Sequence, residues 1–320
     1  MIAKTPWACH TQDMAQPRRP ALGEIEAAVE TLKDVVVRTP LVPLHGDDGG
    51  AAILIKVETH QPVGSFKIRG VFNAVAALSD DERRRGLSTV SAGNTAQALA
   101  WTGRHFGVPA RSLMPETAPK GKIEAVRAYG GEAILVPTEE VFRFLKEHGW
   151  EDEPYAYIHP WTNRNVMIGH GTMGMEIVAD CPEVDTVFIP VGGGGLMGGV
   201  GSALKALKPG IRIVAVEPQG CPSLQQSLRV GRPVSVECNT ICDGVAVPYI
   251  TDEMFPLLQD LADDAILVTD DAVRAAVRRL ALGDKVVAEP SGALSLAAAL
   301  ATPPANRGTT VCLVTGGSLA

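Results

Sequence analysis

Apolar and polar positions along this chain repeat with two different periods, one helical and one extended. Residues 21–36 carry apolar side chains at helical spacing, which predicts a first amphipathic helix that ends at Thr39-Pro40-Leu41. The apolar run 53–57 predicts a short strand, and the run 71–78 predicts a helix. The stretch Gly64-Ser65-Phe66-Lys67-Ile68-Arg69-Gly70 therefore lies at or just before the N-terminus of that helix.

From residue 87 the pattern becomes a regular alternation of strands and helices. The first array has strands at 87–90, 110–114 and 133–136 and helices at 96–105, 120–129 and 139–148. A second array, which begins with a helix near residue 171, has strands at 186–191, 211–216 and 310–314 and helices at 196–207, 271–282 and 291–300. Such alternation is typical of parallel sheets covered by helices. We therefore predict two α/β domains, with a ligand cleft at the carboxyl ends of their strands.

The composition narrows the possible functions. The chain has 320 residues, of which 46% are hydrophobic and 20% are charged, as in ordinary globular proteins. Its net charge of −7 argues against nucleic acid or an anionic membrane as a partner. No run of about 18 apolar residues occurs, so we expect no membrane span. Residues 1–20 lack the apolar core of a signal peptide, and we expect a flexible N-terminal tail there.

The cysteines are scattered rather than grouped. They lie at positions 9, 181, 221, 238, 242 and 312. None forms a CxxC pair, and Cys238 and Cys242 lack the second pair that would complete a zinc site. This spacing predicts reduced thiols in a cytoplasmic protein.

Lys67 is the candidate catalytic residue. Lysines on helices favour the C-terminal end, where their charge meets the negative pole of the helix dipole. At the positive pole the charge is disfavoured, so we expect a lowered pKa for Lys67. A lowered pKa suits a lysine that acts as a nucleophile, as a base or as a Schiff-base former. The alternative is a solvated lysine beside a glycine turn.

A run of four glycines forms the second candidate site. The strand 186–191 leads directly into Gly192-Gly193-Gly194-Gly195, and a helix follows, which predicts a phosphate site built from backbone N–H groups. Gly193, Gly195 and Gly198 also satisfy GxGxxG, and Glu217 lies where a ribose-binding acid is expected, so a dinucleotide-dependent dehydrogenase is an alternative. That alternative leaves Lys67 and the turn at 91–95 without a role, whereas a phosphate-bearing aldehyde cofactor uses all three features.

In combination, these motifs resemble the pyridoxal-phosphate enzymes of fold type II, in particular the serine/threonine dehydratases and serine racemases. The resemblance extends from Thr39-Pro40-Leu41 to Gly317. It rests on the Gly64–Gly70 stretch, Ser91-Ala92-Gly93-Asn94, Met114-Pro115, Ala118-Pro119, Lys122, His159-Pro160, Gly169-His170-Gly171-Thr172, Gly192–Gly195, Glu289-Pro290-Ser291-Gly292-Ala293 and Thr315-Gly316-Gly317. The form of the lysine motif, with lysine two residues before arginine, resembles that of the dehydratases.

The resemblance implies a fold, a domain division and a set of site residues. The fold is α/β and similar to the tryptophan synthase β subunit, with two domains that each contain a mostly parallel twisted sheet covered by helices. A large cofactor-binding domain is expected over 21–86 and 164–320, and a small mobile domain over 87–163. The implied cofactor-binding residues are Phe66, Lys67, Asn94, Gly192, Gly193, Gly194, Gly195, Leu196, Glu289, Thr315 and Gly316. The implied substrate-binding residues are Ser91, Ala92, Gly93, Asn94, Thr95 and Trp161.

The implied activity is a pyridoxal-phosphate dependent dehydration and deamination. The expected substrate is a β-hydroxy amino acid, L-threonine or L-serine, and the products are a 2-oxo acid and ammonia. Dehydration of 3-hydroxyaspartate or phenylserine, serine racemisation, and a degenerate relative without turnover remain alternatives. A homodimer is expected. Because the chain ends three residues after Gly317, no C-terminal regulatory domain is expected.

Several positions depart from the family pattern. Ala92 stands where racemases carry a second serine, which favours elimination over racemisation. Glu217 is the candidate metal ligand, but its usual acidic partner is missing, so no metal is predicted. His159 and His170 are interpreted as structural histidines with their hydrogen bonds satisfied. Trp161 stands where smaller or polar residues are common, which predicts an unusual pocket shape.

Overall fold

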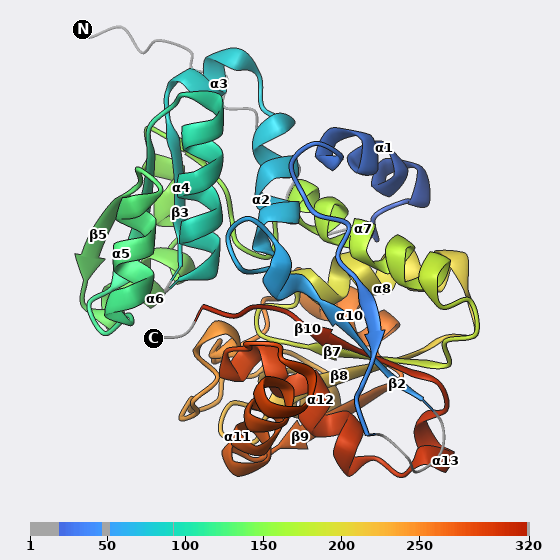
Figure 1. Ribbon diagram of the computed structural model, residues 1–320. Coiled ribbons are helices and arrows are strands. Elements are labelled where there is room, and N and C mark those ends of the chain that lie inside the picture. Colours follow the sequence, from blue (N-terminus) through green and yellow to red (C-terminus); the bar gives the residue numbers. More distant parts are fainter. Residues whose placement is uncertain (1–18, 47–51, 92, 319–320) are drawn as a thin grey trace, which may run out of the picture.

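The computed structural model describes residues 19–46, 52–91 and 93–318. Most of the predicted N-terminal tail, together with Cys9 and Ala92, lies outside these residues. The described chain forms two separate sheets with helices around them (Figure 1). The prediction of an α/β fold with two mostly parallel, helix-covered sheets is therefore confirmed.

The larger sheet has the strand order β1-β2-β10-β7-β8-β9. Its strands are β1 (Leu41–Pro43), β2 (Ile53–Val57), β7 (Thr186–Pro190), β8 (Arg212–Pro218), β9 (Asp264–Val268) and β10 (Thr310–Val314). Only the β1–β2 pair is antiparallel; the other neighbours are parallel. The last strand in the sequence, β10, thus lies in the middle of the sheet, between β2 and β7.

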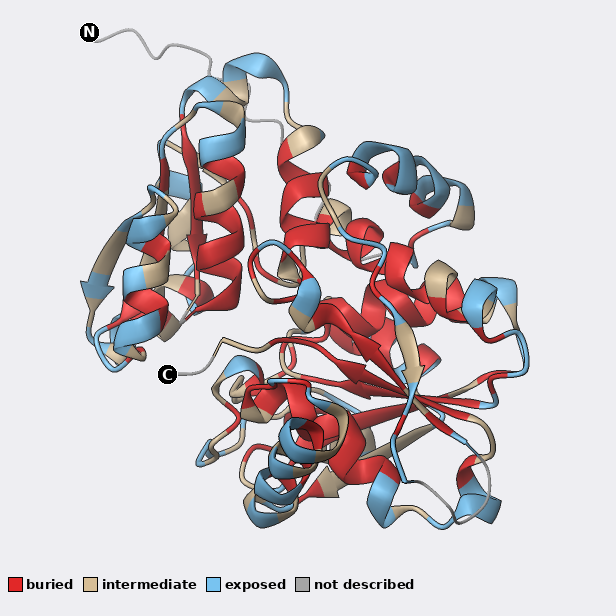
Figure 2. Ribbon diagram, in the orientation of Figure 1, coloured by how far each residue is buried: buried red, intermediate tan, exposed pale blue. Residues whose placement is uncertain are grey.

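Helices cover both faces of the larger sheet, so its strands are apolar on both sides. In β7, Val187 and Ile189 belong to one buried cluster and Phe188 to the other. The surrounding helices are α1 (Leu22–Leu32), α2 (Lys67–Ala76), α7 (Arg164–Asp180), α8 (Gly195–Leu207), α9 (Ser223–Val230), α10 (Met254–Leu261), α11 (Asp270–Arg279), α12 (Pro290–Ala301) and α13 (Pro304–Arg307). In Figure 2 the central strands are buried, and the outer faces of α1 and α11 are exposed.

The smaller sheet is wholly parallel and has the order β5-β4-β3-β6. Its strands are β3 (Leu87–Val90), β4 (Ala110–Pro115), β5 (Glu132–Val136) and β6 (Ala156–Tyr157). Its helices are α4 (Asn94–Phe106), α5 (Lys120–Ala128) and α6 (Thr138–Lys146), and α3 (Asp80–Arg84) precedes it. Short turns of 3-10 helix lie at Glu58–His60 (η1), Gly149–Asp152 (η2) and Asp243–Val245 (η3), and a π-helical turn lies at Leu280–Asp284 (η4).

Some predicted elements differ from the observed ones. The first helix ends at Leu32 rather than at residue 36. The charged run at 80–85 forms the short helix α3, because Ser79 and Glu82 make a reciprocal capping box at its N-terminus. The predicted pattern also missed α9 and α10, whose apolar residues pack against the larger sheet, and β9, which is an edge strand of that sheet.

The prediction that the cysteines are reduced is wrong for one pair. Cys221 and Cys238, which are 17 residues apart, form a disulfide that ties the segment before α9 to the loop after it. Cys181 and Cys242 are buried thiols. No helix in the described part of the chain is long and apolar enough to cross a membrane.

Candidate active site

A cavity of about 400 Å³ lies between the two sheets, at the carboxyl ends of their strands. Val90, Pro115 and Pro190 mark the strand ends that reach it. The predicted site residues that line it are Phe66, Lys67, Ser91, Gly93, Asn94, Thr95, Trp161, Gly192, Gly193, Gly194, Gly195, Leu196, Glu289 and Thr315. Gly316 lies directly behind this lining, since an added Cβ would be 2.7 Å from Glu289 Oε1. The fold therefore brings together motifs that are up to about 250 residues apart.

Lys67 is the first residue of α2, as the sequence predicted, and its side chain reaches this cavity. Burial lowers the pKa of Lys67 from 10.5 to about 8, although the negative charge of Glu289 acts in the opposite direction. The backbone before it is fixed by the loop after β10. Phe66 N–H donates to the carbonyl of Thr315 at 3.0 Å, and Gly317 N–H donates to the carbonyl of Gly64 at 2.9 Å. Thr315 is thus held beside the lysine turn.

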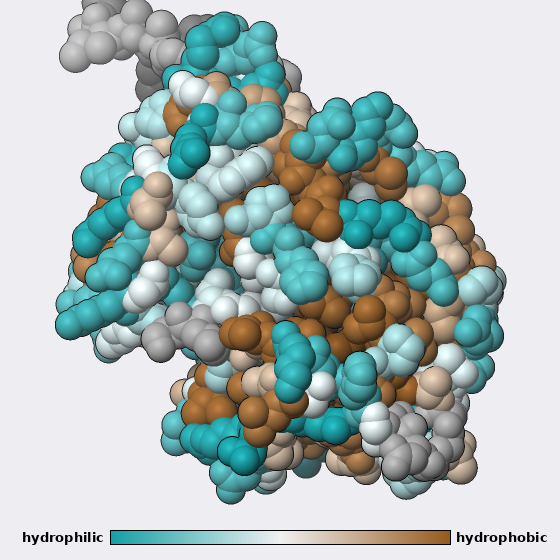
Figure 3. Space-filling model, in the orientation of Figure 1, coloured by the Kyte–Doolittle hydropathy of each residue, from teal (hydrophilic) through white to brown (hydrophobic). Residues whose placement is uncertain are grey.

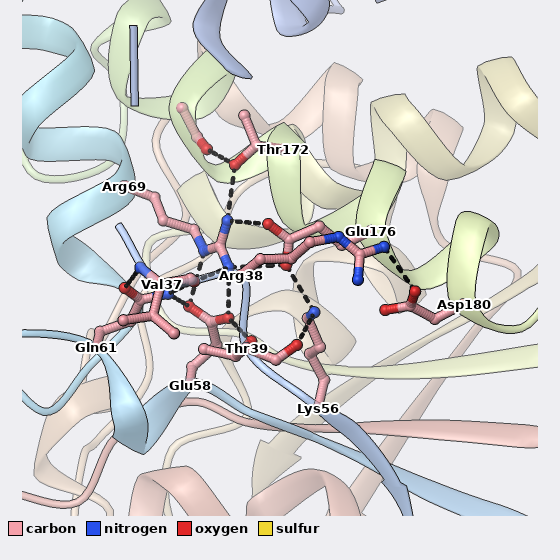
Figure 4. A network of polar contacts seen from close by, with 11 residues as sticks. Val37, Arg38, Thr39, Lys56, Glu58, Gln61, Arg69, Thr172, Glu176 and Asp180 are labelled. Carbon is pink, nitrogen blue, oxygen red and sulfur yellow. Dashed lines mark hydrogen bonds and ion pairs between the residues drawn. The ribbon is translucent and has the colours of Figure 1, made fainter. Parts of the chain in front are cut away.

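A buried ionic network anchors the helix that carries Lys67 (Figure 4). Arg69 Nε and Nη2 each donate to the Glu58 carboxylate at 2.8 Å, and its Nη1 and Nη2 donate to Glu176 at 2.7 and 2.9 Å. Lys56 pairs with Glu176 at 2.6 Å and donates to the carbonyl of Thr39 at 2.7 Å. The side chains of Arg69, Glu58 and Lys56 are fully buried.

The network also shifts the pKa of the buried Glu58 carboxyl. Burial by itself would raise the pKa of Glu58, but Arg69, Thr39 and Lys56 outweigh it and leave this pKa lowered. Arg69 also donates to Thr172 Oγ1 at 3.1 Å, so the network links α2 to α7 as well as to β2 and η1. The sequence signal for it was a lysine, Lys56, within an otherwise apolar strand.

The glycine loop between β7 and α8 has no room for side chains. A Cβ at Gly193 would lie 2.3 Å from Trp161 Cδ2, and one at Gly195 would lie 2.8 Å from the Trp161 Cα. Gly194 has φ +91°, which disfavours other residues, and its Cβ would meet Leu258 at 2.5 Å. The backbone amides at the N-terminus of the 13-residue helix α8 therefore face a cavity at the positive pole of the helix, as a phosphate group requires.

A second helix N-terminus faces the same cavity. Helix α4 begins at Asn94, directly after Gly93, whose N–H donates to Ser91 Oγ at 3.1 Å. Asn94 Nδ2 donates to Glu289 Oε1 at 2.6 Å, whereas its buried Oδ1 has no partner among the described residues. Thr95 is buried at the start of the same helix. This end of α4 is suited to an anionic group such as a carboxylate.

An ion-pair cluster that the motifs did not predict lies in the cavity wall. Lys122 Nζ is 2.6 Å from Asp243 and 3.1 Å from Glu289. Burial opposes the charge of Lys122, but the two carboxylates prevail and leave its pKa raised. Burial raises the pKa of Glu289, and Asp243 adds to this effect. The sequence signal for Asp243 was an acid enclosed by apolar residues, without any periodicity to assign it to a surface.

Trp161 lies where the two sheets meet. Its indole lies over Gly193, and its buried Nε1–H has no partner among the residues that the structure describes. The residue also packs against Val90 of β3 and against Val141 and Leu145 of α6. Trp161 is thus part of the cavity wall and part of a hydrophobic cluster at once.

Glu217 serves a purpose other than the predicted ones. Its carboxylate accepts hydrogen bonds from the backbone N–H of Leu224 at 2.7 Å and of Gln225 at 2.8 Å, and from Ser223 Oγ at 3.2 Å. It therefore binds the first turn of α9, which leaves it unsuited to a metal or a ribose. Burial raises its pKa to about 7, against these hydrogen bonds. No metal-binding group of acidic, histidine and cysteine residues occurs among the described residues.

The two structural histidines differ. His159 Nδ1 accepts the N–H of Thr162 at 3.2 Å, as expected of a satisfied histidine. His170 is fully buried, and neither of its ring nitrogens has a partner within the described chain, so that part of the prediction is wrong. Burial, with smaller contributions from Lys67 and Arg69, lowers the pKa of His170 well below its usual value and keeps the ring neutral.

Fold and site together define an α/β enzyme that binds a phosphate-bearing cofactor beside a reactive lysine. A family model described as "pyridoxal-phosphate dependent enzyme" matches residues 32–316. The chain belongs to this family, and its cofactor is pyridoxal phosphate. The residues present fit this cofactor, because the glycine loop lines the cavity at the N-terminus of α8, and Asn94 Oδ1 and Trp161 Nε1 are buried polar atoms without partners in the described chain. The dinucleotide alternative is therefore set aside.

L-threonine ammonia-lyases and serine racemases are similar to the chain over most of its length. It is 37% identical over 307 residues to the L-threonine ammonia-lyase of Thermotoga maritima, which covers 93% of this chain and 75% of that protein. It is 38% identical over 280 residues to the serine racemase of Oryza sativa subsp. indica, with 86% and 82% covered. Among solved structures, maize serine racemase superposes with a TM-score of 0.87 at 34% identity, with 94% of each chain covered. The processed form of threonine deaminase isoform 2 from Solanum lycopersicum gives 0.82 at 33%, with 95% and 92% covered.

Proposed function

We propose that this protein is a pyridoxal-phosphate dependent ammonia-lyase, which converts a β-hydroxy amino acid such as L-threonine or L-serine to a 2-oxo acid and ammonia. The observation that carries this proposal is the convergence of Lys67, the α4 N-terminus and the glycine loop on one cavity. The names of the most similar relatives support it, since L-threonine ammonia-lyases and serine racemases are among them.

Each part of the cavity has a distinct task in this reaction. The amides of Gly192–Gly195 with Leu196 would hold the cofactor phosphate, and Asn94, Glu289, Thr315 and Gly316 would surround its ring, beside Phe66. When bound, the cofactor supplies an electron sink for the electrons of the Cα–H bond. Ser91 and the α4 N-terminus would bind and orient the substrate carboxylate, with Gly93 and Thr95 shaping that turn.

Lys67 would hold the cofactor and move the Cα proton. Its pKa of about 8 leaves roughly a tenth of its amine neutral at pH 7, whereas an ordinary lysine is almost wholly protonated there. Because α2 and the backbone bonds to Thr315 and Gly317 fix its position, Lys67 approaches the substrate from one face. Loss of the β-hydroxyl then competes with reprotonation.

Serine racemisation is the second candidate, favoured by the likeness to the rice and maize racemases. It requires an acid on the face opposite Lys67, and Ala92, which lies outside the described residues, has no proton to give. We expect racemisation to be at least about tenfold slower than elimination, a barrier difference of about 1.4 kcal/mol. Chiral chromatography of residual L-serine beside a 2-oxo acid assay measures the ratio, and Ala92→Ser should raise racemisation.

Three further properties are part of the proposal. Residues 21–86 and 164–320 would form a large cofactor-binding domain, and residues 87–163 a small domain that moves over the cavity. The protein would be a cytoplasmic homodimer, and the apolar side chains that gather near α1 and over the larger sheet in Figure 3 are consistent with a second copy there. Light scattering tests the dimer. Fractionation together with thiol labelling of Cys221 and Cys238 tests the compartment.

The central test uses the purified protein reconstituted with pyridoxal phosphate. Borohydride should fix the cofactor on Lys67, as peptide mapping would show, and a panel of β-hydroxy amino acids should release 2-oxo acid. Lys67→Ala should abolish both, whereas Lys120→Ala, at an exposed lysine of α5, should change neither. Covalent cofactor in Lys67→Ala, or no 2-oxo acid from any member of the panel, would contradict the proposal.

A further inference from the structure

One end of the cavity is an apolar wall that the reaction itself does not require. It consists of Val90, Val141, Phe142, Leu145 and Trp161, all of which line the cavity. The same five residues belong to one hydrophobic cluster of the smaller sheet. The wall is therefore a packed surface and not a set of isolated side chains.

The amphipathic helix α6 presents this wall to the cavity. Val141 and Leu145 are one helical turn apart and buried, and Phe142 beside them is half-buried. Exposed charged residues occupy the other side of the helix, namely Glu139, Glu140, Arg143 and Lys146. The apolar side of α6 thus lines the same cavity as Lys67 and the turn at Ser91.

Charged groups are scarce in the lining and already engaged. Among the described residues that line the cavity, the charged ones are Lys67, Lys122, Asp243 and Glu289. Lys122 is held by both carboxylates, and Lys67 is needed for the chemistry. A second carboxylate on the substrate side chain would therefore have no free lysine or arginine to pair with among the described lining residues. It would also share the cavity with the carboxylates of Asp243 and Glu289. This arrangement disfavours 3-hydroxyaspartate.

On these grounds, and resting on the proposed function, we infer that the preferred substrates are β-hydroxy amino acids with an apolar β-substituent larger than methyl. An aromatic ring or a branched alkyl group on the β-carbon would contact Phe142, Leu145 and Trp161, whereas the hydrogen of serine or the methyl of threonine would leave most of the wall untouched. One methylene in an apolar pocket changes selectivity by about 10- to 200-fold, so a whole ring has a measurable effect.

The test compares kcat/KM of the holoenzyme for L-threo-3-phenylserine, L-threonine, L-serine and L-threo-3-hydroxyaspartate. We expect phenylserine to exceed threonine by at least about tenfold and hydroxyaspartate to be the poorest. Phe142→Ala should lower kcat/KM for phenylserine by at least about tenfold and change that for serine by less than about threefold. The matched control is Phe144→Ala on the same helix, because the Phe144 ring packs against Trp150 and Tyr157 and does not line the cavity.

A binding measurement separates recognition from turnover. L-Phenylalanine, which has no hydroxyl to lose, should inhibit the enzyme more strongly than L-alanine or L-aspartate, and Phe142→Ala should weaken this inhibition. Phe142→Arg should shift preference towards 3-hydroxyaspartate, because it supplies the missing cation.

The outcomes distinguish this inference from the proposed function. If threonine or serine is turned over at least as well as phenylserine, and Phe142→Ala leaves the ratio unchanged, the inference is wrong and the ammonia-lyase proposal stands. If no β-hydroxy amino acid yields 2-oxo acid, both fail. A preference for hydroxyaspartate in the unaltered protein would also overturn the inference.

Discussion

Lys122 Nζ, carried by α5 beside the smaller sheet, lies 3.1 Å from a carboxylate oxygen of Glu289, the residue that precedes α12 on the larger sheet. This buried ion pair joins the two halves of the molecule across the cavity. Glu289 also accepts the Asn94 amide at 2.6 Å, so one carboxylate of the larger-sheet half holds Lys122 and Asn94, which both belong to the smaller-sheet half. This cluster therefore contributes both to the contact between the two halves and to the polarity of the cavity wall.

Replacing Lys122 by methionine should lower the unfolding free energy, because Asp243 and Glu289 lose the cation that pairs with them. Glu289 would lose the charge that opposes the effect of burial, so its pKa would rise further. A buried carboxyl with a raised pKa binds its proton more tightly in the folded state, so the variant should be less stable at pH 8 than at pH 5. We expect a loss of about 3 kcal/mol at pH 8, measured by urea unfolding. Lys120→Met, at an exposed position of α5, is the control; equal losses in both variants would contradict the ion-pair role.

The lowered pKa of Lys67 predicts a pH dependence in the apo-protein. Between pH 8 and 10.5 the unfolded chain would bind the proton that folded Lys67 has released, so the unfolding free energy should rise with pH in this window. Relative to Lys67→Met, the gain should be at most about 3 to 4 kcal/mol, since one pKa unit corresponds to about 1.4 kcal/mol. Parallel stability curves for the two proteins would show that Lys67 is not perturbed. The rate of cofactor attachment should level off above a pKa of about 8.

Because the glycine loop packs closely against Trp161, a side chain added in this loop should weaken cofactor binding. Gly193→Ala places a methyl group 2.3 Å from Trp161 Cδ2, so the loop or the indole has to move. We expect at least about tenfold weaker binding of pyridoxal phosphate, or about 1.4 kcal/mol, in an absorbance titration of apo-protein. Gly210→Ala, which meets nothing within 4 Å, should bind normally. Unchanged affinity in Gly193→Ala would mean that this loop does not hold the phosphate.

The Arg69 network predicts a contrast between buried and exposed ion pairs. Arg69→Met leaves the fully buried Glu58 without its main cation and should cost about 3–5 kcal/mol of unfolding free energy. Arg38→Met removes an exposed arginine that pairs with Asp180 at 2.6 Å and should cost less than about 1 kcal/mol. Chemical denaturation measures both. A small effect at Arg69 would show that α2 is held chiefly by apolar packing.

Much of the site follows from local sequence patterns. The apolar run before Gly192–Gly195 and the helix after it predict the strand, glycine loop and helix N-terminus that the structure has at this place, from residues that are contiguous in the chain. Lys67 at the start of α2 is likewise a local feature, and the lowered pKa follows the predicted direction. Burial, rather than the helix dipole, is the main cause that the structure gives for that shift.

Other features depend on contacts between distant parts of the chain. The insertion of β10 between β2 and β7 brings Thr315 to the lysine turn, and no periodicity in the sequence specifies that strand order. Glu217 lies at the sequence position where a ribose or metal ligand was predicted. Its carboxylate instead accepts hydrogen bonds from the backbone at the start of α9. The disulfide of Cys221 with Cys238 also joins residues whose spacing carries no signal of pairing.

The sequence by itself predicted the main strands and helices around the cavity and the positions of Lys67 and the glycine loop at helix N-termini, because backbone conformation and helix ends are set largely by neighbouring residues. Only the tertiary structure decided which charges meet in the wall, Lys122 with Asp243 and Glu289, that burial lowers the pKa of Lys67, and that α6 turns an apolar face to the cavity. An amphipathic pattern shows that a helix has an apolar side. Which space that side faces depends on how the two sheets pack against each other.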